Sequence, residues 1–139
     1  MGSRKQAIEL FALAAREEGT DTSDWIPVPK DCVGLTLVLD VTAAATDAAD
    51  TLDVVVSTKI GTETAINIQY FTQVLGNGGV KRYIANIVPN VTVTEYAYAA
   101  LTAATKKDIL GDSIQCKWTI VNSSTDDEGF IFSVYAMPF

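Results

Sequence analysis

The sequence predicts a single-domain, all-β protein with an antiparallel β-sandwich or jelly-roll-like fold of about eight strands. Apolar and polar residues alternate with a period of two in most segments, as in strands that have one buried and one solvated face. Turn-forming residues recur roughly every 8–12 residues, and no segment has the pattern of a long helix. With 139 residues and no linker, we expect a sandwich domain over residues 16–139, preceded by an N-terminal arm or first strand over residues 1–15.

The last quarter of the chain has the clearest strand pattern. Apolar and polar side chains alternate over residues 113–120 and again over residues 130–136. The side chains expected to face the core are Ile114, Cys116, Trp118, Ile120, Phe130, Phe132, Val134 and Ala136. Residues 122–129 are polar and end in a glycine, which favours a turn. We therefore predict a long antiparallel hairpin, whose apolar face is covered by the strands that precede it.

The N-terminal segments are less regular. The alanine and leucine content of residues 7–15 favours a helix, but the residues also alternate as in a strand, and we favour an extended first strand or arm. Residues 25–29 (WIPVP) contain two prolines separated by one residue, which suits an edge strand or an extended segment.

The middle of the chain contains three further alternating segments, residues 34–42, 52–57 and 66–71, with a loop over residues 43–50 after the first. Residues 76–79 (GNGG) then form the strongest turn signal, because glycine and asparagine tolerate positive φ. No Gly-Lys-Ser/Thr sequence follows them, so we predict a structural hairpin and not a phosphate-binding loop.

The next strand is expected over residues 81–88, where Pro89 ends it, and another is expected to start at Val91. The alanine-rich residues 97–112 are interpreted as a loop that could include one helical turn. These segments complete the count of about eight strands.

Composition excludes several classes of function. The net charge is −7 and the ten basic residues are scattered, which argues against a nucleic-acid partner. The chain has no histidine, and it therefore lacks the usual general base, the usual partner of a serine or cysteine nucleophile, and imidazole metal ligands. We expect no enzymatic activity and no cofactor.

The two cysteines, Cys32 and Cys116, could form a disulfide, but the inward register of Cys116 favours two free thiols. No stretch is apolar for long enough to span a bilayer, so no membrane partner is expected. These features predict a soluble protein that is synthesised in the cytoplasm.

The polar and aromatic residues that could form sites each have an ordinary structural explanation. The acidic residues 126–128 could bind a cation such as Ca²⁺, or they could form a solvated turn, which we favour. The pairs Asp21 with Asp24 and Asp47 with Asp50 are interpreted as turn formers. Trp25 and Trp118 could line a sugar-binding face; the inward register of Trp118 predicts a core position, whereas Trp25 is the better candidate for a contact surface.

Four parts of the sequence, in order, resemble a group of small virion structural proteins of tailed bacteriophages, which are similar to head decoration (cement) proteins. They are residues 22–26 (TSDWI), residues 35–44 (LTLVLDVTAA), residues 51–54 (TLDV) with 71–73 (FTQ), and residues 117–120 (KWTI) with 129–134 (GFIFSV).

The resemblance implies a homotrimer on the outer surface of the phage capsid, with the major capsid protein as its partner. The residues expected to contact a neighbouring subunit or the capsid are Arg4, Lys5, Ile8, Leu10, Trp25 and Phe139. Two alternatives remain open: a tail, neck or fibre component, and a carbohydrate-binding adhesin module.

Overall fold

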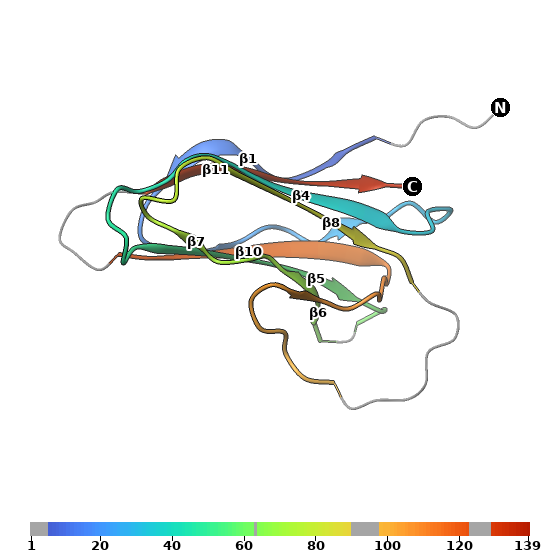
Figure 1. Ribbon diagram of the computed structural model, residues 1–139. Coiled ribbons are helices and arrows are strands. Elements are labelled where there is room, and N and C mark those ends of the chain that lie inside the picture. The colour runs from blue at the N-terminus through green and yellow to red at the C-terminus, as the bar shows by residue number, and fades with distance from the viewer. Residues whose placement is uncertain (1–5, 63, 90–97, 123–128) are drawn as a thin grey trace.

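The computed structural model describes residues 6–62, 64–89, 98–122 and 129–139, and every regular element in these ranges is a β-strand. The strands form two antiparallel sheets, one of four and one of seven strands, that pack face to face (Figure 1). The predicted all-β sandwich is therefore confirmed. The described residues form eleven strands, more than the expected eight, because four of the eleven are short strands of two to four residues.

The four-stranded sheet has the order β1 (Ile8–Arg16), β11 (Phe130–Pro138), β4 (Leu35–Ala43) and β8 (Lys81–Ile87). The main path of the seven-stranded sheet is β2 (Gly19–Thr22), β10 (Ser113–Val121), β5 (Thr51–Lys59), β6 (Ile66–Tyr70) and β9 (Thr105–Lys106). Two short strands complete it: β3 (Ile26–Pro27) pairs with β10, and β7 (Val74–Leu75) pairs with β5. The expected edge strand at residues 25–29 corresponds to β3.

The predicted hairpin of residues 113–136 is wrong, although both of its strands exist. β10 pairs with β2, β3 and β5, whereas β11 lies in the other sheet between β1 and β4. The two strands therefore contribute to opposite walls of the sandwich (Figure 1). A period of two shows which side chains of a strand are buried. Because both walls bury their inner side chains against the same core, the pattern does not show to which wall a strand belongs.

The glycine-rich turn at residues 76–79 also joins the two sheets, so the predicted hairpin there is wrong as well. β7 before the turn pairs with β5, and β8 after it pairs with β4. Asn77 and Gly79 have φ values of 59° and 73°, as expected of a tight turn. A Cβ atom on Gly76 would lie 1.8 Å from the carbonyl oxygen of Asp47, so this position requires glycine.

Residues 98–112 contain no helical turn; the strand β9 and irregular chain occupy this stretch. The strand expected to start at Val91 and the acidic residues 126–128 lie outside the described residues. At the N-terminus, the strand interpretation holds for β1, which pairs antiparallel with β11 from Ile8 opposite Ala136 to Arg16 opposite Phe130.

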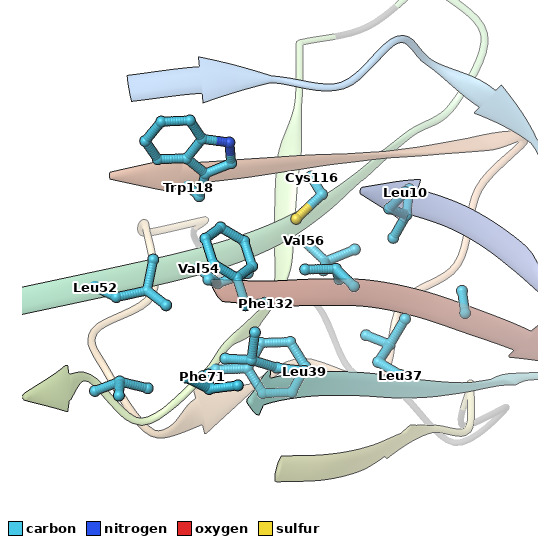
Figure 2. Close-up of a cluster of buried hydrophobic side chains, with 14 of the residues drawn as sticks. Leu10, Leu37, Leu39, Leu52, Val54, Val56, Phe71, Cys116, Trp118 and Phe132 are labelled. Carbon is cyan, nitrogen blue, oxygen red and sulfur yellow. The ribbon is translucent and has the colours of Figure 1, made fainter. Parts of the chain in front are cut away.

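The core lies between the two sheets and is built from the side chains that alternate inward (Figure 2). All eight residues predicted to face the core in the last quarter of the chain are buried. Trp118 of β10 meets Phe132 of β11 edge to face across the core, with ring centroids 6.1 Å apart (Figure 2). Leu35, Leu37, Leu39 and Val41 of β4 are fully buried in the same core. Burial of this apolar surface is the main force that holds the two sheets together.

Candidate interaction surface at the Phe139 end

The last residue of the chain is fixed to the start of β4 by its backbone. The N–H of Phe139 donates to the carbonyl oxygen of Gly34 over 3.1 Å, and the N–H groups of Val33 and Gly34 donate to the carbonyl oxygen of Phe139 over 2.6 and 3.3 Å. The Phe139 side chain nevertheless remains 42% exposed. The chain end therefore presents an aromatic ring from a fixed backbone.

We call the end of the sandwich that carries this residue the Phe139 end. In the four-stranded sheet, Leu35 at the start of β4 lies opposite Pro138 and Ile87. In the seven-stranded sheet, the corresponding position is Ser113 at the start of β10, which lies opposite Pro27 and Lys59. Both sheets therefore contribute strand ends to this surface, where the C-terminus also lies (Figure 1).

Large apolar side chains are exposed at the Phe139 end. These side chains are between 38% and 66% exposed and belong to Val33, Ile60, Val88, Met137 and Phe139. A pocket of about 520 Å³ lies at the same end of the sandwich. Its lining is rich in proline and consists of Pro27, Val28, Pro29, Lys30, Cys32, Pro89, Leu110, Gly111 and Asp112. Apolar side chains gathered beside a recess are typical of a surface that another macromolecule covers.

Hydrogen bonds hold the loops of this surface in place. Asp112 has a central position: its N–H donates to the carbonyl oxygen of Lys59 over 2.9 Å, and its carbonyl oxygen accepts from the N–H of Val28 over 3.0 Å. Its carboxylate also accepts from the N–H of Gly61 over 2.7 Å. The Asp108 carboxylate accepts from the N–H of Val88, just after the end of β8, over 3.1 Å. The loops are therefore ordered before any partner binds, which lowers the entropic cost of binding.

Three of the residues predicted from the sequence as contacts lie at this end. Phe139 is described above, and Ile8 is half-buried opposite Ala136. Trp25 is half-buried, and the ammonium of Lys59 lies 4.7 Å from the centroid of its ring. A cation at this distance from an indole ring stabilises the local arrangement.

The other predicted contacts are placed differently. Leu10 is only 5% exposed and is part of the core (Figure 2), so its side chain serves packing in this structure. Arg4 and Lys5 lie outside the described residues.

Val33, Ile60 and Val88 were not predicted from the sequence as contact residues. Each stands next to a glycine or a proline, in Val33-Gly34, Ile60-Gly61 and Val88-Pro89. An apolar residue beside a chain-turning residue lies where a strand starts or ends, and there the core no longer covers it. This combination is the signal that could have identified them.

The two cysteines are free, as predicted. Cys116 is fully buried among the core residues, and burial raises the pKa of its thiol. Cys32 is partly exposed and lines the pocket at the Phe139 end.

The interpretation as turn formers holds for Asp47 and Asp50, since the N–H of Asp50 donates to the carbonyl oxygen of Asp47 over 3.0 Å, but it is wrong for Asp21, which lies within β2. Asp47 accepts a hydrogen bond from the N–H of Ala49 over 3.0 Å, and Asp21 accepts one from the N–H of Thr22 over 2.8 Å. No group of three or more potential metal ligands occurs among the described residues. Within the same ranges, no helix has the length and apolar content needed to cross a bilayer.

Comparisons of the chain with models of known protein families, with curated proteins and with solved structures find no match in any of the three.

Proposed function

We propose that this chain is a structural protein of a tailed-bacteriophage virion, a decoration protein that binds the outer surface of the head and stabilises the shell. Two lines of argument support the proposal. The first is the resemblance of four sequence segments to such proteins. The second, and the observation that carries most weight, is the ordered apolar surface at the Phe139 end.

The Phe139 end has the composition expected of a binding surface. Five of the large exposed apolar side chains lie at this one end, beside a pocket, and exposed apolar patches commonly mark contacts with other macromolecules. A stable interface covers about 800 Å² on each partner. The exposed side chains, the proline-lined pocket and the Trp25 region together offer a surface that subunits of the shell could cover.

The proposed mechanism is binding and not catalysis. A protein that binds only the assembled shell stabilises it by mass action, to an extent set by its affinity and concentration. We further propose a homotrimer whose partner is the major capsid protein. A trimer at a local three-fold position binds several capsid subunits at once, and each contact raises the effective concentration of the next. The net charge of −7 disfavours binding to the packaged or released DNA.

The proposal is tested with two measurements on the purified chain. Light scattering at several concentrations gives the native mass, and we expect a trimer that persists on dilution. Co-sedimentation with DNA-free heads of the phage that encodes the chain tests binding, and we expect saturable binding at a fixed ratio to the major capsid protein.

Failure to co-sediment with the DNA-free heads would contradict the proposal. Labelled antibodies on whole virions check the location independently. Label on the head supports decoration, whereas label confined to the tail, neck or fibres would contradict it.

A further inference from the structure

A second pocket, of about 350 Å³, lies on the outer face of the seven-stranded sheet and shares no lining residue with the pocket at the Phe139 end. Strands β5, β6 and β10 form its floor, and the chain at residues 100–101 contributes to its wall. The residues that line it are Val55, Ser57, Ala65, Asn67, Tyr70, Ala100, Leu101, Gln115 and Lys117. Its volume is at the lower end of the range for small-molecule sites, roughly 300–1,000 Å³, which suits one ring better than an extended chain.

An irregularity in β6 turns two polar side chains toward this pocket. Tyr70 pairs with Val55 and Asn67 pairs with Ser57, but the register shifts between these two pairs. The extra residue is Ile68, whose side chain is buried in the core. A bulge of this kind allows Asn67 and Tyr70 to lie on the same outer face, although an odd number of steps separates them along the strand.

The Tyr70 side chain is held by a carboxylate beside the pocket. Its hydroxyl donates to Oδ1 of Asp53 over 2.9 Å. The amide of Gln73 donates to both oxygens of the same carboxylate, over 3.2 and 3.0 Å. Partial burial and the hydrogen bond to Asp53 both raise the pKa of Tyr70, so its hydroxyl is protonated at neutral pH.

Asn67 fixes the wall of the pocket. Its N–H donates to the hydroxyl oxygen of Tyr98 over 3.2 Å, and its side-chain oxygen accepts from the N–H of Leu101 over 3.2 Å. Its side-chain nitrogen donates to Oγ of Ser57 over 3.0 Å. Lys107 supports the same segment, because its ammonium donates to the carbonyl oxygen of Ala99 over 3.0 Å and lies 4.6 Å from the Tyr98 ring centroid. The pocket is therefore formed before a ligand enters.

Two polar side chains of the lining have no internal role. Among the described residues, no hydrogen bond or ion pair engages the amide of Gln115 or the ammonium of Lys117. Lys117 alone of the nine lining residues is charged. A protein of net charge −7 thus presents a single cation, an amide and an aromatic side chain around one small recess.

We propose that this pocket binds a carboxylated pyranose, a hexuronate. The amide of Gln115 suits ring hydroxyl groups, which both donate and accept hydrogen bonds. The apolar surface of Val55 and the Tyr70 ring suits the C–H face of the sugar. The ammonium of Lys117 suits the carboxylate, in a charge-assisted hydrogen bond. This site goes beyond the proposed structural role, since it lies on a different surface and needs no capsid partner.

The test is an NMR titration of the ¹⁵N-labelled full chain with two matched pairs of sugars: methyl glucuronide with methyl glucoside, and methyl galacturonide with methyl galactoside. Members of a pair differ only by a carboxylate in place of a hydroxymethyl group. We expect one uronide to shift the amide signals around Asn67, Tyr70, Gln115 and Lys117, and to bind at least about fivefold more tightly than its neutral counterpart.

Variants assign the effect to the pocket. Lys117→Gln is expected to abolish the difference in affinity between the uronide and its neutral counterpart. The matched charge removal Lys81→Gln, on β8, is expected to preserve that difference. Gln115→Ala is expected to weaken binding of both sugars by about tenfold, whereas Thr119→Ala on the same strand leaves it unchanged. Spectral dispersion confirms that each variant is folded. The proposal is overturned if neither uronide shifts these signals at roughly 50 mM, or if the uronide and the neutral sugar bind equally.

Discussion

Phe139 and Gly34 exchange two backbone hydrogen bonds, so that the last residue of the chain extends the pairing of β11 with β4 by one step. The ring of Phe139 lies over Gly34: a Cβ atom at position 34 would be 2.6 Å from Cζ of Phe139 and 2.5 Å from the carbonyl oxygen of Ile87. The absence of a side chain at Gly34 therefore determines how the chain end packs.

The substitution Gly34→Ala is expected to lower the free energy of unfolding by about 1–3 kcal/mol, because the carbonyl of Ile87 belongs to the backbone of β8 and cannot rotate away. Thermal unfolding measures the effect, and for a domain of this size the midpoint should fall by several degrees. The neighbouring change Val33→Ala, at an exposed side chain, is the control and should have little effect. An unchanged midpoint for Gly34→Ala would show that the chain end is not packed in this way.

Arg16 stabilises the irregular edge strand β1. Its guanidinium donates to the carbonyl oxygens of Ala12, Ala14 and Phe132 over 2.7, 3.2 and 2.8 Å, and it lies 4.6 Å from the centroid of the Phe132 ring. Arg16→Lys keeps the charge but loses the planar fork of donors, so we expect a loss of about 1–2 kcal/mol in urea unfolding. Arg82→Lys, in the exposed pair with Asp40 at 3.3 Å, is the matched control and should cost less than about 0.5 kcal/mol. Equal effects for the two variants would contradict the role of Arg16.

The sequence was sufficient to predict the fold class and the buried faces of β10 and β11, because a sandwich buries every second residue of both walls. The sequence was not sufficient to predict which strands pair with one another. The alternation in β10 and β11 is the same whether the two strands form a hairpin or lie in opposite sheets. The turn at residues 76–79 likewise has the residues of a hairpin but connects β7 in one sheet to β8 in the other.

Burial of Cys116 makes stability depend on pH in the alkaline range. The folded protein holds this thiol protonated above its ordinary pKa of about 8.5, whereas the unfolded chain releases the proton there. The stabilising contribution is therefore complete below about pH 8.5 and is lost as the pH rises, by about 1.4 kcal/mol per pH unit.

In a Cys32→Ser background, we expect the free energy of unfolding to fall by about 1.4 kcal/mol more between pH 7 and 9.5 than in the same background with Cys116→Ala. Urea unfolding at the two pH values measures the difference, and subtracting the two variants removes the contribution of other titrating groups. The same pH dependence in both variants would exclude Cys116 as its source.

Single residues of the candidate interaction surface could be predicted from the sequence, but the positions of the two sites in the fold could not. Ile8, Trp25 and Phe139 were identified because they are apolar residues in segments expected to be extended or terminal. Their gathering at one end could not be predicted without the strand order, since they come from distant parts of the chain. The pocket on the seven-stranded sheet depends on the bulge at Ile68, which period-two alternation does not reveal.

The most direct test of the proposed function compares two double variants in binding to DNA-free phage heads. Val33→Ser with Val88→Ser removes two exposed apolar side chains from the Phe139 end. Leu75→Ser with Val80→Ser removes two exposed apolar side chains from the end of β7 and the turn that follows it. We expect the first pair to weaken head binding at least tenfold, a loss of about 1.4 kcal/mol or more, and the second to leave it unchanged. Equal binding by both variants and the wild-type chain would contradict docking through the Phe139 end.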